Sequence, residues 1–285
     1  GKGVSQDYVM AVSFYKKAAE KGQPEGQLNL GIMYNEGKGI REDHEKAVFW
    51  FKKAAEKGLL EAQLNLGMMY KFGRGLEENF TKAVFWFKKP AEIGLAEAQT
   101  NLGWMYEFGK GVEQDYLEAI LWYKKAAEQG DVKAQLNLAS IYKYGKGVAK
   151  DYDQVFYWNN LSAEKGSAIA QFNLGVIYEY GLGIDEDYTK SVFWYKKSAE
   201  QGYIEAQISL GEMYESGRGV EADYTESVFW YRKAAEQGNT QAQLNLGDLY
   251  KNGKGFAEDY SQSFYWYKKV AEQGDAEAQL NIGTM

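Results

Sequence analysis

A 36-residue internal repeat constrains this chain more than any other feature of its sequence. The triplet Asn-Leu-Gly, or a near variant, recurs at this step and ends at Gly31, Gly67, Gly103, Ala139, Gly175, Gly211, Gly247 and Gly283. A tryptophan column keeps the same step at Trp50, Trp86, Trp122, Trp158, Trp194, Trp230 and Trp266. The 285 residues therefore hold about eight repeats, and such a period is typical of solenoids, in which each repeat packs only against its neighbours.

Each repeat is predicted to form two helices separated by glycine stops. In the first segment, which we call helix A, small or apolar residues recur with helical spacing, as at Ala98, Leu102 and Tyr106. Helix A should end at the first glycine of each Gly-x-Gly motif, such as Gly109, because glycine readily takes the left-handed conformation that closes a helix. Helix B should begin at an Asp or Asn, such as Asp115, whose side chain accepts hydrogen bonds from the first free backbone N–H groups.

Two further expectations concern helix B. One tryptophan per repeat at a fixed phase is predicted to pack in the core between helices, so Trp194→Ala should cost about 3–5 kcal/mol of stability. Pro90 stands late in helix B, in a column that elsewhere favours alanine. Because proline removes a helical hydrogen bond, we expect a kink or an early end there.

Composition and charge exclude several classes of protein. The chain has no cysteine and a single histidine, His44, which leaves no disulfide framework and too few ligands for a zinc centre. A net charge of −7 argues against nucleic acid as the partner. No apolar run approaches the roughly 18 residues that a membrane-spanning helix needs, so membrane insertion is not expected. The lack of cysteine permits a cytoplasmic location, but the sequence leaves the compartment open.

No group of residues in the sequence has the pattern of an active site. The Gly-Lys-Gly motifs lack the Gly-Lys-Ser/Thr of a phosphate-binding loop. Basic residues recur within these motifs and are interleaved with acids, so we expect a solvated edge of mixed charge at Lys2, Lys38, Arg74, Lys110, Lys146, Arg218 and Lys254. The sequence therefore predicts a protein that is not an enzyme and holds no cofactor or metal.

The unit EAQLNLGMMYKFGRGLEENFTKAVFWFKKPAE, at residues 61–92, closely resembles the Sel1-like repeat, a relative of the tetratricopeptide repeat. The resemblance extends over the whole chain. It implies an all-α fold, a right-handed α-solenoid superhelix of 36-residue helix-turn-helix repeats whose A helices line the concave side. It also implies an adaptor or scaffold role. Because the chain begins at Gly1 within a loop and stops at Met285 within an A helix, we expect residues 1–285 to be a single array, incomplete at both ends and part of a longer one.

One line of side chains on helix A, opposite its core stripe, is the candidate binding surface. In repeat three this line contains Asn101, Trp104 and Phe108. Trp104 is the only tryptophan outside the tryptophan column. The equivalent positions of nearby repeats are apolar or aromatic at Met68, Phe72, Tyr144, Val176 and Tyr180, whereas later repeats offer Glu212 and Asp248. The line either forms a groove that buries the apolar anchors of a partner or packs between successive repeats, and the sequence favours neither.

An asparagine column occupies the same line, at Asn65, Asn101, Asn137 and Asn173. An asparagine side chain both donates and accepts hydrogen bonds, so a row of them suits the backbone of an extended peptide. Hydrogen bonds to the neighbouring repeat are the favoured interpretation, because near-identical copies suit a structural requirement.

Three functions fit these observations. The first is a non-enzymatic scaffold that binds a peptide or protein segment in its groove, with a partner that is apolar at one end and basic at the other. The second is a glycan-binding or cell-wall-binding module, since tryptophan, tyrosine and asparagine also suit sugars. The third is a purely structural array. The identity of the partner and the oligomeric state stay open.

Overall fold

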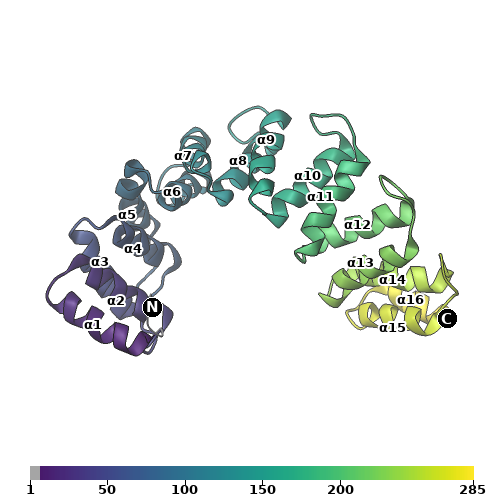
Figure 1. Ribbon diagram of the computed structural model, residues 1–285, viewed down its shortest axis with the longest axis horizontal. Helices are drawn as coiled ribbons and strands as arrows, with labels where there is room; N and C mark the ends of the chain where they lie inside the picture. Colours follow the sequence, from purple (N-terminus) through teal and green to yellow (C-terminus); the bar gives the residue numbers. More distant parts are fainter. Residues whose placement is uncertain (1–6) are drawn as a thin grey trace. The chain divides into compact units, whose positions relative to one another are not determined.

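The computed structural model describes residues 7–285, so Lys2 and the loop expected at Gly1 lie outside the described residues. Within them the chain forms sixteen α-helices and no strand (Figure 1). The B helices are α1 (Tyr8–Glu20), α3 (His44–Glu56), α5 (Phe80–Ile93), α7 (Tyr116–Glu128), α9 (Tyr152–Glu164), α11 (Tyr188–Glu200), α13 (Tyr224–Glu236) and α15 (Tyr260–Ala271). The A helices are α2 (Pro24–Glu36), α4 (Leu60–Phe72), α6 (Ala96–Phe108), α8 (Val132–Tyr144), α10 (Ala168–Tyr180), α12 (Ile204–Ser216), α14 (Thr240–Asn252) and α16 (Ala276–Thr284). The predicted all-α array of helix-turn-helix repeats is confirmed.

Local capping explains where the helices begin and end. At the start of every B helix an Asp or Asn side chain accepts a backbone hydrogen bond, as Asp43 Oδ1 does from the Lys46 N–H at 2.9 Å. The A helix α6 ends at Gly109, whose φ of 60° is left-handed. A residue with a Cβ atom is strained at that angle, which accounts for the first glycine of each Gly-x-Gly motif.

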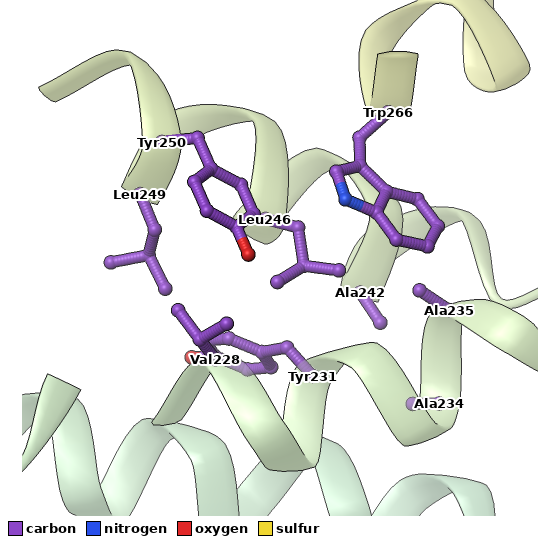
Figure 2. Close-up of a cluster of buried hydrophobic side chains, with 9 residues drawn as sticks. All are labelled: Val228, Tyr231, Ala234, Ala235, Ala242, Leu246, Leu249, Tyr250 and Trp266. Atoms are coloured by element: carbon purple, nitrogen blue, oxygen red, sulfur yellow. The ribbon is translucent and has the colours of Figure 1, made fainter. Parts of the chain in front are cut away.

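The array divides into two compact units, Gly1–Lys150 and Asp151–Met285. In each unit, consecutive helices pack against one another and bury a series of small apolar clusters. Figure 2 shows one cluster of the second unit, in which Tyr231, Leu246 and Trp266 converge from α13, α14 and α15. Each cluster joins one repeat to the next, as expected of an array in which repeats cannot bury their own apolar faces alone.

The glycine of Asn-Leu-Gly leaves room for an aromatic ring of helix B, which lies directly against the backbone of helix A. A Cβ atom added at Gly103 would lie 2.7 Å from Cδ1 of Tyr123, too close for any side chain. The same contact recurs between Gly67 and Phe87 and between Gly175 and Tyr195. Tyr123, Phe87 and Tyr195 are at most 1% exposed. These rings, and not the tryptophans before them, are the deepest aromatic side chains of the array.

The prediction that the whole tryptophan column is core was therefore wrong in part. Trp122, Trp158, Trp230 and Trp266 are buried, but Trp50, Trp86 and Trp194 are half-buried. Among the large side chains of these B helices, the residue that follows each tryptophan is more deeply buried than the tryptophan itself. A large stability loss should accordingly be expected at Trp230 and a smaller one at Trp194.

Helix α5 does not end early at Pro90. Helix α5 continues through Pro90 to Ile93 and is 14 residues long, against 13 for the other B helices of the first unit. Pro90 has no N–H to bond back to the preceding turn, but it stands in the last turn of α5, where the loss of one hydrogen bond does not end the helix. Its own carbonyl accepts a hydrogen bond from the Leu95 N–H at 2.9 Å.

Candidate functional site

A cavity of about 650 Å³ opens between the A helices α4, α6 and α8 of the first unit. We call it the Trp104 cavity, and its lining residues are Met68, Lys71, Phe72, Glu97, Thr100, Asn101, Trp104, Asp131, Val132, Lys133, Leu136 and Asn137. Five of the residues chosen from the sequence therefore meet in one hollow: Met68, Phe72, Asn101, Trp104 and Asn137. They meet because positions one repeat apart on A helices come to lie side by side.

Trp104 has contacts on two sides. Its ring centroid is 6.3 Å from that of Phe80 and 5.2 Å from that of Phe108. It is half-buried, and the part left uncovered lines the Trp104 cavity. The two interpretations of Trp104 are thus compatible, since the same indole packs between repeats and presents a face to the cavity.

Lys71 projects from α4 onto that indole. Its ammonium nitrogen lies 4.0 Å from the ring centroid of Trp104, within range of a cation–π interaction, and donates a hydrogen bond to Asn101 Oδ1 at 2.9 Å. Burial, and secondarily the charge of Lys133, lower the pKa of Lys71 to about 8. Among residues 7–285 no acidic side chain forms an ion pair with Lys71. The cavity therefore contains a cation whose charge is not neutralised by the described chain.

A second, smaller cavity of about 430 Å³ adjoins the first. It lies between α2, α4 and α6 and shares Met68, Phe72 and Glu97 with the Trp104 cavity, while Asn65 adds an amide to its lining. Phe72 is 52% exposed although it is a large apolar side chain. The two cavities therefore form a continuous candidate surface along four successive A helices, α2, α4, α6 and α8.

The asparagine column is engaged mainly by the array itself. Asn65 and Asn101 each donate from Nδ2 to the backbone carbonyl four residues earlier, at 2.8 and 2.9 Å. Asn173 Nδ2 instead donates to Asn159 Oδ1 at 2.8 Å. Asn101 Oδ1 already accepts from Lys71 of the preceding repeat. These bonds use part of the hydrogen-bonding capacity that an extended peptide would need.

The remaining aromatic candidates lie outside the two cavities. Phe108, Tyr144 and Tyr180 are 48%, 61% and 61% exposed. Val176 is half-buried and packs against the apolar cluster of the second unit that contains Tyr195 and Leu210. Phe108, Tyr144 and Tyr180 thus stand on exposed parts of their helices, whereas Val176 contributes chiefly to packing.

The acidic candidates meet in the second unit. Glu212 and Asp248 line a cavity of about 360 Å³ between α12 and α14, together with Glu215 and Lys254. Burial and the nearby charge of Glu179 raise the pKa of Glu212. Asp248 Oδ1 accepts a hydrogen bond from the Tyr267 hydroxyl at 2.5 Å. This cavity is a concave site with excess negative charge.

A recurring chain of three side chains was not foreseen from the sequence. Glu107 is 5% exposed, accepts a hydrogen bond from the Tyr123 hydroxyl and forms an ion pair of 2.9 Å with Lys146, which lies in the loop after α8, one repeat further on. The same arrangement joins Tyr195, Glu179 and Arg218, and again Tyr231, Glu215 and Lys254. Arg218 and Lys254 are exposed, as the expected solvated edge requires, whereas Lys146 is half-buried. The ion pairs of these three cations with acids one repeat earlier were not expected. The signal that could have found them is an acid with a tyrosine 16 residues later and a cation 39 residues later.

Within the described residues, no group of three or more His, Cys, Asp or Glu side chains is placed to hold a metal ion. In the same part of the chain, every helix is too short or too polar to cross a bilayer.

The Sel1 repeat model matches eight consecutive segments, at residues 1–23, 24–59, 60–95, 96–131, 132–167, 168–203, 204–239 and 240–275. The chain belongs to the Sel1 repeat family. Proteins of this family generally mediate protein–protein interactions, and their repeat fold is generally non-enzymatic.

Solved structures of Sel1 repeat proteins resemble the chain closely. A protective antigen of uropathogenic Escherichia coli is 40% identical with a TM-score of 0.88, over 99% of this chain and 60% of the antigen. The chain thus spans about 60% of the length of that relative. A Sel1 repeat protein from Oxalobacter formigenes is 34% identical with a TM-score of 0.77, over 99% of this chain and 82% of that one. Yeast Tom70, at 15% identity and a TM-score of 0.50 over 97% of this chain and 57% of its own, shares the fold alone. No curated protein sequence matches the chain significantly.

Proposed function

We propose that this Sel1 repeat array is a non-catalytic scaffold that binds an extended or helical protein segment on its A helices. The Trp104 cavity is its principal anchor site in the first unit. The observation that carries this proposal is the convergence of Met68, Phe72 and Trp104 in one hollow that also contains two amides and two lysines. Largely apolar hollows with a few polar groups are the usual form of a binding site.

The Trp104 cavity suits an apolar anchor in size and chemistry. A volume of about 650 Å³ exceeds that of a single large side chain and leaves room for the flanking backbone. Burying one Leu or Phe side chain contributes about 1.5–3 kcal/mol, and aromatic residues at the centre of an interface often supply much of its affinity. Trp104 supplies such a surface without a large entropic cost, because packing against Phe80 and Phe108 already orients it.

The acidic cavity of the second unit suits a basic residue of the partner. Partial burial of the carboxyl group raises the pKa of Glu212, and the negative charges of Glu179 and Glu215 raise it further. A Lys or Arg side chain would relieve this repulsion, and exposed charges of this kind chiefly accelerate association. The partner is accordingly expected to carry apolar or aromatic residues for one unit and Lys or Arg for the other.

Binding screens on the intact chain test this function. The chain is probed with a peptide array and a glycan array, and affinities for the best peptide are compared between the parent, Trp104→Ala and Phe85→Ala. Phe85 is 68% exposed on a B helix and lies outside the A-helix surface, so it is a matched aromatic control. Weaker binding by Trp104→Ala alone supports the proposal.

Other outcomes of these screens favour the two alternative functions. Selective binding on the glycan array, without peptide binding, identifies a carbohydrate module, since Trp104 and the cavity amides also suit sugars. Failure of both screens favours a structural array. Peptide binding that is equal in the parent and Trp104→Ala contradicts the assignment of the Trp104 cavity as the anchor site.

A further inference from the structure

We infer that the Trp104 cavity recognises a carboxylate carried next to an apolar side chain of the bound segment. This inference rests on the proposed function and names the chemistry that the cavity selects. Lys71 would hold the carboxylate, while Met68 and Trp104 would pack against the neighbouring apolar side chain.

The first argument is the position of Lys71 in the repeat. Lys71 occupies the same position of helix A as Glu107, one repeat earlier. Glu107 accepts a hydrogen bond from a tyrosine hydroxyl and pairs with Lys146, a cation in the loop after α8. In repeat two the corresponding ring is Phe87, which has no hydroxyl to donate. The array thus has a lysine where three other repeats have an internally bound carboxylate. Unlike Lys143 in the same column, Lys71 lines the cavity.

The second argument is the charge around Lys71. Lys133 lines the same cavity and adds a second positive charge. The two acids of the lining are Asp131 and Glu97. Asp131 caps α8 by accepting a hydrogen bond from the Ala134 N–H at 2.8 Å, and Glu97 is exposed in the first turn of α6. Neither forms an ion pair with Lys71 or Lys133 among the described residues, so the cations remain available to a bound anion.

The third argument is geometric. An ammonium group has three N–H donors, and one of those of Lys71 is used by Asn101 Oδ1. The ring of Trp104 lies on one side of the nitrogen, and Val132 and Leu136 add apolar wall. A carboxylate can accept a remaining N–H in this partly desolvated place, where charge-assisted hydrogen bonds are strong. An apolar side chain beside that carboxylate then covers the wall.

The position of Lys71 also predicts how binding depends on pH. Its pKa is lowered to about 8 by burial and by Lys133, and a bound anion favours the charged ammonium and so raises that pKa. Affinity for a carboxylate should therefore be greatest below pH 8 and decline as the pH rises through that value. The other charged groups that line the cavity are Lys133, Glu97 and Asp131.

Three short probes test the inference on the intact chain. They are N-acetyl-Leu-Phe with a free C-terminal carboxylate, the same dipeptide as its C-terminal amide, and N-acetyl-Glu-Phe amide, which carries its carboxylate on a side chain. Binding is followed by NMR at the indole N–H of Trp104, assigned with Trp104→Phe. We expect at least one carboxylate probe to bind about tenfold more tightly than the amide at pH 7, and to lose that advantage at pH 9.5.

The matched variants are Lys71→Met and Lys143→Met. Both lysines occupy the same position of helix A, but Lys143 is exposed and lies outside the cavity lining. Lys71→Met should bind all three probes alike, whereas Lys143→Met should retain the preference for a carboxylate. Glu97→Gln should bind the carboxylate probes more tightly than the parent does.

The outcomes separate this inference from the proposed function. If the amide binds as tightly as both carboxylate probes, the inference is overturned while the apolar anchor site stands. If no probe perturbs the Trp104 indole, both are overturned. Tight binding of the free acid alone identifies a chain terminus as the source of the carboxylate, and tight binding of the Glu-Phe amide identifies an acidic side chain.

Discussion

The hydroxyl of Tyr123 donates a 2.8 Å hydrogen bond to the carboxylate of Glu107, and both side chains are buried. Burial and the charge of Glu107 raise the pKa of Tyr123 above its ordinary value, so the phenol stays protonated and able to donate. Lys146, in the loop after α8, neutralises the same carboxylate. A charge that would be costly to bury alone thereby ties two successive repeats together.

This arrangement predicts a loss of stability in Tyr123→Phe. Removing the hydroxyl leaves a buried carboxylate with one donor fewer, which should cost about 1–3 kcal/mol. Urea unfolding of the parent and the variant measures the difference. Tyr157→Phe is the control, because Tyr157 is 51% exposed, and it should unfold like the parent. Equal midpoints for Tyr123→Phe and the parent would show that the hydrogen bond contributes nothing.

The contact between Gly103 and Tyr123 predicts that Gly103→Ala is destabilising even though alanine favours helices. The new methyl group would lie 2.7 Å from the tyrosine ring, and overpacking of this kind costs about 1–3 kcal/mol. Gly283→Ala is the matched control, since nothing lies within 4 Å of a Cβ atom at that helical glycine. Thermal unfolding should show a lower midpoint for Gly103→Ala alone, and stabilisation by it would refute the contact.

The tryptophan column should not respond uniformly to truncation. Trp230 is 7% exposed and Trp194 is half-buried. We therefore expect Trp230→Ala to cost about 3–5 kcal/mol and Trp194→Ala distinctly less, because less of its surface leaves contact with the core. Denaturant unfolding of the two variants under the same conditions provides the comparison. A larger loss at Trp194 would contradict the burial described above.

Deletion of residues 204–239 should yield a shorter folded array. This segment is one complete repeat, and in a solenoid each repeat depends only on its neighbours. Circular dichroism should show the helical signal per residue of the parent, with a cooperative thermal transition at a lower temperature. Loss of the cooperative transition would mean that the repeats of this unit depend on more distant contacts.

Glu212→Lys should act on the rate of association. Exposed charges steer a partner more than they hold it, so the reversed charge should slow association with a basic segment and remove much of its salt dependence. The measurement is surface plasmon resonance at two ionic strengths, with the best peptide of the array. Glu221→Lys, an exposed acid outside the acidic cavity, controls for net charge. Equal salt dependence in both variants would exclude the acidic cavity as the steering site.

The helices could be predicted from the sequence because their ends are local features. Asp43 caps the helix that follows it within three residues, and Gly109 closes the helix that precedes it. How deeply each aromatic side chain is buried could not be predicted as well. Trp122 and Tyr123 are adjacent aromatic residues, and helical spacing alone does not decide which of two neighbours lies deeper. The chain from Tyr123 through Glu107 to Lys146 was missed for another reason, since it forms only when two repeats pack together.

The candidate site, like the fold, could be predicted only in part from the sequence. A shared helix face placed Met68, Asn101 and Trp104 on one line, and the structure brings them into one cavity. Lys71 was not selected, because its sequence neighbours give no sign that its ammonium lies on the ring of a tryptophan one repeat away.

The ion-paired acids Glu107, Glu179 and Glu215 restrict how this gene can change by recombination. Each needs a tyrosine on the next B helix and a cation in the loop one repeat further on. An unequal crossover that placed Leu182 where Lys146 now stands would leave the buried carboxylate of Glu107 without a counterion. The loss of that counterion would lower the stability of the fold by several kcal/mol. Repeats of equal length are therefore not interchangeable, and their order in the chain is itself under physical selection.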